Sequence, residues 1–175
     1  MTEKKVLTAR FMSALNDELG WDAVVDRDDE PRFDSGLGFR IWMSNYAPSD
    51  PEYLQISTAF ALTQFLEQAR SPLDASIMEI QVRLLKVGAR LTRRLKGVKV
   101  LVLPDDDVVT FSVETVAAGP NRMPTVEHLA SILPRMRAML IAGVRDFHDE
   151  SVLAGLEATI SPNGPTPTIN PDRPA

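Results

Sequence analysis

The sequence predicts a single α+β domain in which an antiparallel sheet packs with helices, in the order α-β-β-β-α-β-β-α. Three observations support this fold class. A long amphipathic helical pattern over residues 73–96 runs directly into two strands that form a hairpin. The segments before this helix alternate between apolar and polar residues, as half-buried strands do. A last helical pattern follows the hairpin and reaches Phe147 or beyond.

The first part of the chain predicts a helix and a short strand. Apolar residues recur at helical spacing over residues 3–19, and Gly20 is placed to end that helix. Residues 23–25 form a short strand that an acidic turn follows. We expect a break at Pro31 and at the glycines near residue 37.

Two longer strands precede the central helix. In residues 39–44, Ile41 and Met43 share one predicted face, because apolar and polar residues alternate there. A strong turn signal then leads into a strand over residues 53–62. Residues 62–70 fit either an extension of this strand or a helical turn.

The central helix is predicted over residues 73–96. Pro72 and Asp74 are placed to open it, and Gly97 is placed to close it. Its apolar residues follow a spacing of three and four, which predicts one buried stripe. The stripe consists of Ile77, Ile80, Leu84, Val87, Leu91 and Leu95.

The hairpin and the last helix complete the predicted domain. The hairpin strands cover residues 98–103 and 108–117, with an acidic turn between them. Thr125 is a good N-cap for the last helix. Pro134 lies too deep in this helix for a first-turn proline, so we expect a kink or a restart there.

The chain divides into one folded domain and a tail. Residues 1–160 are expected to form the domain, and residues 161–175 a proline-rich disordered tail. The net charge of −5 argues against a general nucleic-acid-binding protein, and the longest apolar runs are too short to span a membrane. We therefore expect a cytoplasmic protein with no nucleic-acid partner and no membrane partner.

No motif in the sequence predicts catalysis. The chain has no cysteine, and its two histidines, His128 and His148, fit neither HExxH nor a Ser-His-Asp arrangement. No glycine-rich phosphate-binding motif occurs. The acidic turns at residues 26–30 and 105–107 lack the spacing of a calcium loop, so we interpret them as structural. We expect no enzymatic activity, no cofactor and no metal site.

Three segments carry a resemblance to a known family. They are the helix–hairpin unit at residues 71–117, the strand pair FRIWMSN and EYLQIST, and the final helix motif PTVEHLASILPRMRAML. Over about residues 3–150 the chain resembles the type III secretion chaperone-like fold that YbjN-type proteins share. The resemblance implies a small, commonly dimeric α/β sandwich that binds polypeptide segments and has no enzymatic activity.

Charge is distributed unevenly along the chain. Residues 17–34 hold eight acidic residues, whereas residues 81–104 hold seven basic residues and no acidic one. Three interpretations of the basic helix remain open: a solvated face, a pairing with the acidic segment within the chain or across a dimer, and a docking surface for an acidic partner. The candidate docking residues on this helix are Arg83, Lys86, Arg90, Arg93 and Arg94.

Two aromatic residues are candidates for partner contact. Strand alternation places Trp42 and Tyr53 on the sheet face opposite the one that packs on the central helix. Either the first or last helix covers this face, or it contacts a polypeptide or a second copy of the chain.

The leading functional hypothesis is a non-catalytic protein- or peptide-binding module, chaperone-like or regulatory and homodimeric. It would capture a polypeptide by strand-edge pairing and apolar pockets. The alternative is a small-molecule-sensing regulatory domain with a pocket between sheet and helices. Methionines could line such a pocket; they include Met12, Met43, Met78, Met136 and Met139.

Overall fold

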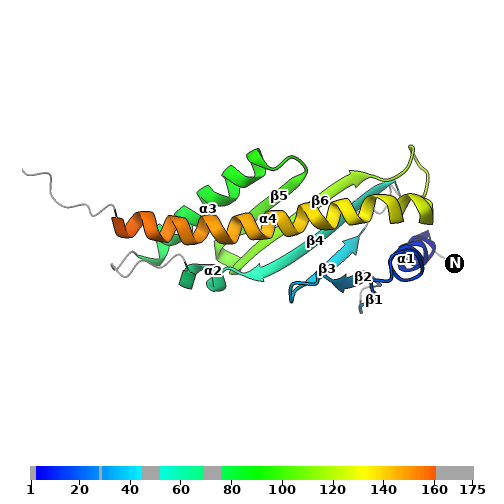
Figure 1. The fold of residues 1–175 in the computed structure, drawn as a ribbon, viewed down its shortest axis with the longest axis horizontal. Helices are drawn as coiled ribbons and strands as arrows, with labels where there is room; N and C mark the ends of the chain where they lie inside the picture. Colours follow the sequence, from blue (N-terminus) through cyan, green and yellow to red (C-terminus); the bar gives the residue numbers. More distant parts are fainter. Residues whose placement is uncertain (1–2, 28, 45–51, 69–75, 161–175) are drawn as a thin grey trace, which may run out of the picture.

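The computed structural model describes residues 3–27, 29–44, 52–68 and 76–160. Within these residues the chain forms two layers, a six-stranded sheet and a set of helices that lie against one of its faces (Figure 1). The predicted class, an α+β fold with an antiparallel sheet packed with helices, is confirmed.

The sheet is antiparallel throughout, with the strand order β1-β2-β3-β4-β6-β5. Its longest pairing joins β4 and β6, from Tyr53 opposite Val116 to Ala61 opposite Val108. This register fixes which side chains share a face, because a shift of one residue would reverse every side chain. The strands are β1 (Val24–Val25), β2 (Pro31–Asp34), β3 (Arg40–Ser44), β4 (Tyr53–Ala61), β5 (Val98–Leu103) and β6 (Val108–Val116).

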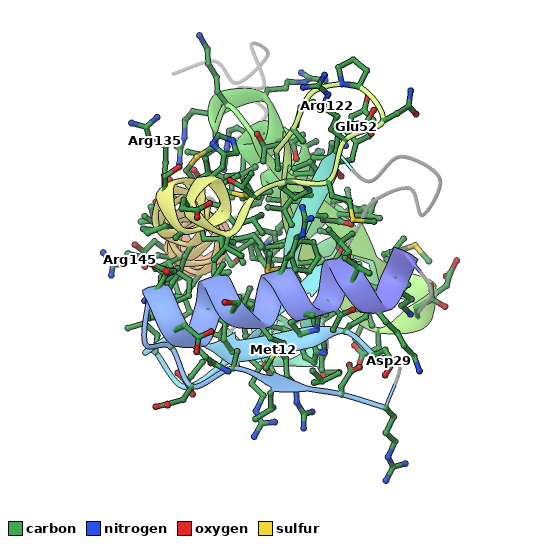
Figure 2. All side chains as sticks on the ribbon, turned by 90° about the vertical axis from the view of Figure 1, so that its right-hand side faces the viewer. Met12, Asp29, Glu52, Arg122, Arg135 and Arg145 are labelled. Carbon is green, nitrogen blue, oxygen red and sulfur yellow. The ribbon has the colours of Figure 1, made fainter. Side chains whose placement is uncertain are left out.

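The helices share one face of the sheet. The longest, α4 (Val126–Ile160), crosses β4, β5 and β6, and α3 (Ile77–Arg94) packs on β5 and on α4. The first helix, α1 (Glu3–Ser13), continues into a π-helical turn (Ala14–Glu18) and packs on β2 and α4. Figure 2 views α4 end-on, with α1 running crosswise to it.

Strand alternation builds the core. On β3 the side chains of Ile41 and Met43 are buried, and on β6 every second residue from Val109 to Val113 is buried as well. The facing side of α4 supplies residues spaced mainly four and three apart, the spacing of a helix stripe that packs on a flat surface. These are Leu129, Leu133, Met136, Leu140 and Phe147, none more than 4% exposed.

Two glycines let the helices approach β5 closely. A Cβ added to Gly143 of α4 would lie 2.7 Å from Cγ1 of Val98, and one added to Gly88 of α3 would lie 3.0 Å from Cγ2 of Val102. Both distances are shorter than ordinary van der Waals contact. The absence of a side chain at these positions therefore sets how tightly the two helices pack on this strand.

The structure has one strand more than predicted. β2 begins at Pro31, where the sequence suggested a break. A proline is tolerated as the first residue of a strand, because the missing N–H need not pair there. The ambiguous segment that begins at residue 62 contains a short helix, α2 (Thr63–Gln68), rather than a strand extension.

The start of α3 differs from the prediction. Ser76 is extended and forms a capping box with Glu79, so the helix begins at Ile77. Pro72 and Asp74 lie outside the described residues. Ile77 was predicted to be core but is 65% exposed, because it lies in the first turn, ahead of the residues that reach β5.

The last helix begins as predicted and continues further. Thr125 caps α4, since its hydroxyl accepts a hydrogen bond from the His128 N–H. The pKa of Glu127 lies below its usual value, because its carboxylate accepts hydrogen bonds from its own backbone N–H and from the Thr125 side chain. The expected restart at Pro134 is wrong: α4 passes through this exposed residue without interruption (Figure 1).

The buried stripe of α3 should account for much of the stability of this layer. We expect Leu84→Ala and Leu91→Ala each to lower the free energy of unfolding by about 2–5 kcal/mol, because both side chains are fully buried. Leu153→Ala on α4 is the control; its side chain is 54% exposed, so the change should stay within about 0.5 kcal/mol. Urea denaturation followed by circular dichroism measures all three, and equal losses would contradict the assignment of the stripe.

Candidate partner-binding site

The sheet face away from the helices is the main candidate surface. One row of side chains crosses all six strands on this face, because successive pairs lie opposite one another in the register. All members of the row are half-buried or exposed, whereas their neighbours along each longer strand are buried. The row consists of Val24, Arg32, Trp42, Ser57, Ser112 and Lys99.

The structure places both predicted aromatic residues on this face. Trp42 is half-buried in β3, and Tyr53 is 40% exposed at the start of β4. Val116 lies opposite Tyr53 and is 57% exposed. Because α1 and α4 pack on the other face, neither of these helices covers the two aromatic side chains.

The middle of this open sheet face is lined by small side chains, with larger apolar ones toward its ends. Ser57, Ala59 and Ser112 lie on the central strands β4 and β6. Leu101, which is 54% exposed, lies on β5. A surface of this kind allows another backbone to approach closely while aromatic and apolar groups provide contact area.

Trp42 borders a hollow that contains two arginines. The hollow has a volume of about 660 Å³ and is lined by Val25, Asp26, Arg27, Arg32 and Trp42. The Nε atom of Arg32 is buried and has no hydrogen-bond partner among the described residues. Sequence reasoning missed Arg32, because no strand was predicted at residues 31–34 and only the pairing of β2 with β3 brings Arg32 beside Trp42.

The basic face of α3 is partly engaged within the chain. Arg90 donates from Nε to Glu150 Oε2 at 2.7 Å, and Arg94 donates from Nη2 to Asp146 Oδ2 at 2.7 Å. The other oxygen of Glu150 is buried 2.6 Å from Arg94 Nη1, an electrostatic contact rather than an aligned hydrogen bond. Within the chain, these two arginines therefore pair with α4 and not with the acidic segment at residues 17–34.

The remaining basic residues of α3 form no ion pair among the described residues. Lys86 and Arg93 are exposed, and Arg83 is half-buried. The structure does not bring these residues together with Trp42, because α3 packs on β5 and the strand order places β4 and β6 between β5 and β3. The two sets of predicted residues therefore belong to separate surfaces.

Both edges of the sheet carry a side chain that occupies backbone groups. At β5, the Thr92 hydroxyl accepts from Val100 N–H at 3.0 Å and donates to Val100 C=O at 3.2 Å. Beside β1, Asn16 accepts from Ala23 N–H at 2.6 Å and donates to Ala23 C=O at 3.1 Å. A polypeptide that added a strand at these points would have to displace Asn16 or Thr92.

The acidic turns have structural partners. Asp26 Oδ1 accepts from the Glu30 N–H at 3.0 Å, and Asp107 Oδ1 accepts from the Thr63 N–H at 2.9 Å, at the start of α2. Within the described parts of the chain, no group of three or more His, Cys, Asp or Glu side chains is arranged to hold a metal ion. His148 is exposed, with Nδ1 3.3 Å from Asp149 Oδ1.

No protein-family model matches the chain, and no curated protein matches it. Among solved structures, the chain is similar to one chain in the structure of the HopA1-SchA chaperone-effector complex, with 12% sequence identity and a TM-score of 0.49; the match covers 85% of this chain and 98% of that chain. No helix of the described ranges is long and apolar enough to cross a membrane.

The ion pairs between α3 and α4 lead to a stability prediction. We expect the double variant Arg90→Gln/Arg94→Gln to lower the free energy of unfolding by about 1–2 kcal/mol, because Glu150, only 13% exposed, would lose its cationic partners. The matched control Lys86→Gln/Arg93→Gln should stay within about 0.5 kcal/mol. Urea denaturation at low and high salt tests this, and two variants of equal stability would show that the pairs contribute nothing.

Proposed function

We propose that the protein is a non-catalytic, cytoplasmic module, chaperone-like or regulatory, that binds a polypeptide segment or partner protein on the open sheet face. The observation that carries the proposal is that α1, α3 and α4 all lie on one side of the sheet, while Trp42 and Tyr53 lie on the other. The sequence resemblance to chaperone-like and YbjN-type proteins supports the same kind of function.

The chemistry of the open face suits a polypeptide partner. Tryptophan and tyrosine contribute large contact areas, and they are frequent among the residues that dominate binding energy. Arg32 and Arg27, beside Trp42, add positive charge that an acidic side chain of the partner could meet. Docking by side chains on the face also leaves the occupied edges of the sheet undisturbed.

The basic residues of α3 have a secondary role in this proposal. Lys86 and Arg93 remain available to attract an acidic partner, whereas Arg90 and Arg94 already bind α4. Exposed charges act mainly on the rate of association, and salt screens them. Together with Arg83, they orient the partner rather than hold it.

An outward stripe on α3 supports the proposed homodimer. Met78, Val82 and Leu85 are 73%, 43% and 41% exposed, and their spacing of four and three places them on one side of the helix. Thr92 continues this side toward β5, away from the arginines that face α4. An apolar helical stripe of this kind is suited to pack on a second copy of itself.

The homodimer proposal is tested by the oligomeric state. We expect the wild-type chain to be a dimer at micromolar concentration and Met78→Lys/Leu85→Lys to be monomeric, since a charge would be buried at each position. Val24→Lys, at a similarly exposed apolar position on β1, should remain dimeric. Size-exclusion chromatography with light scattering distinguishes the states, and a monomeric wild-type chain would rule the dimer out.

The partner face is tested with Trp42 as a fluorescent reporter. Trp21→Phe leaves Trp42 as the only tryptophan, and Trp21 is half-buried and packs on the core residue Phe33, where phenylalanine is a conservative replacement. With a permanently unfolded polypeptide that lacks tryptophan as the probe, we expect a saturable blue shift of the emission as the indole is covered.

The companion variant removes the aromatic contacts. Trp42→Ser/Tyr53→Ser should bind the same labelled probe at least about tenfold more weakly, because two large contact side chains are lost. Leu153→Ser, an exposed residue of α4, is the control and should bind as the wild type does. Equal binding by both variants, measured by fluorescence anisotropy, would place the partner on another surface.

One observation favours the alternative function, a small-molecule-sensing regulatory domain. A cavity of about 430 Å³ lies between the sheet and the helices, within the range of small-molecule sites. Its lining differs from the predicted one: phenylalanines line it, and none of the five methionines singled out in the sequence does. Met43 and Met136 are core residues instead.

A further inference from the structure

The cavity between sheet and helices is bounded by three separate parts of the chain. One wall comes from the turns of α4 around Ile141 and Val144, and the opposite side comes from the start of α2. The loop between β2 and β3 closes the remaining side with Leu37. In Figure 1, α2 lies beside the half of α4 that follows residue 140.

The floor of the cavity is an aromatic cluster. Phe60 packs edge-to-face on Phe39 and on Phe65, with ring centroids 5.3 Å and 5.9 Å apart. The cluster continues into the core through Phe111 and Phe147. Phe39 and Phe60 are only half-buried, although β4 turns Phe60 toward the core side of the sheet. The floor is therefore aromatic, apolar and partly uncovered.

The mouth of the cavity carries an exposed leucine on a fixed loop. The Ser35 hydroxyl accepts from the Leu37 N–H at 3.1 Å and from the Phe39 N–H at 3.3 Å. Arg137 of α4 donates to the Ser35 C=O at 2.7 Å, which ties the loop to the helix. Leu37 is nevertheless 57% exposed. A loop held by these contacts presents an apolar side chain at the cavity mouth at the cost of exposing it to water.

The polar groups of the rim are neutral or cationic. They are Gln64, Arg145 and His148, and among the described side chains no carboxylate lines the cavity. Of the nearest acidic residues of α4, Asp146 accepts from Arg94, and the Asp149 carboxylate lies 3.3 Å from Nδ1 of the rim residue His148. Arg145 forms no ion pair among the described residues, and Figure 2 shows it pointing away from the body of the molecule.

We propose that this cavity binds a small amphipathic carboxylate, with its acyl or aryl chain on Phe39 and Phe60 and its carboxylate at Arg145. An apolar floor with an arginine at its rim matches such a ligand in both parts. The arginine side chain is long and exposed, so it can fold over the mouth once the chain is seated. This inference deepens the small-molecule alternative and stands apart from polypeptide binding, because the cavity and the open sheet face lie on opposite sides of the sheet.

The test uses octanoate as the probe and octanol as its uncharged match. In amide NMR spectra of the full chain, octanoate should cause saturable shifts at residues 37, 144 and 148. Its affinity should exceed that of octanol about twofold to fivefold, the range expected for an exposed charge pair. Arg145→Gln should abolish this difference, whereas Arg135→Gln should preserve it. Arg135 is exposed on the same helix and also points away from the body (Figure 2).

A second variant tests the apolar part of the site. Leu37→Ser should weaken octanoate and octanol equally, and Leu153→Ser, at a similarly exposed position, should weaken neither. All four side chains are exposed, so each variant is expected to fold.

Three results would overturn the proposal. They are the absence of saturable shifts with octanoate, shifts confined to residues outside the cavity, and a preference for octanoate that survives Arg145→Gln. Tighter binding of the uncharged N-acetyl-leucinamide at the same residues would assign the cavity to a side chain of a bound polypeptide instead. None of these results affects the Trp42 emission test, so failure here and failure of polypeptide binding remain distinguishable.

Discussion

The structure depends above all on the packing of α4 along one face of the sheet. Its buried stripe meets β4, β5 and β6, and the same helix contacts α1, α2 and α3. The other surfaces follow from this contact. Asp146 and Glu150 hold α3 through ion pairs, Arg137 holds the β2–β3 loop, and Val144 forms a wall of the cavity. Because α1, α3 and α4 gather on one side, none of them covers the opposite sheet face.

The sequence was a good guide wherever a short-range periodicity decides the structure. Alternation in β3 and β4 predicted which side chains face the core, since the period of a strand forces the choice. The stripe of α3 was predicted for the same reason, apart from Ile77. Ile77 has the spacing of the buried stripe, but a side chain is buried only where another element packs on it, and Ile77 lies ahead of the residues that reach β5. The sequence does not predict β2, because Pro31 suggests a break and because the pairing of β2 with β3 is a tertiary contact that strand propensity does not contain.

The candidate sites were predictable to a smaller extent. The side of the sheet that Trp42 and Tyr53 occupy follows from alternation alone. The ion pairs of the basic helix α3 do not follow from the sequence pattern, because Arg90 and Glu150 are sixty residues apart in sequence and only the packing of α3 on α4 brings them together. The cavity is less predictable still, since α2, α4 and the β2–β3 loop each contribute a side to it. The signal within the loop was an apolar Leu37 between two glycines, both of which adopt positive φ.

The side chains that bond to backbone groups at the two sheet edges indicate how a partner would bind. Asn16 and Thr92 use the same device at opposite edges: each side chain bonds to both the N–H and the C=O of one residue, Ala23 or Val100. An exposed edge invites pairing with any extended chain, so these contacts lower the tendency toward unspecific strand addition. The open face has no backbone groups to offer, and binding there depends on side chains. Recognition through Trp42, Tyr53 and the arginines beside Trp42 would therefore be more selective than strand-edge pairing, which accepts almost any sequence as a backbone partner.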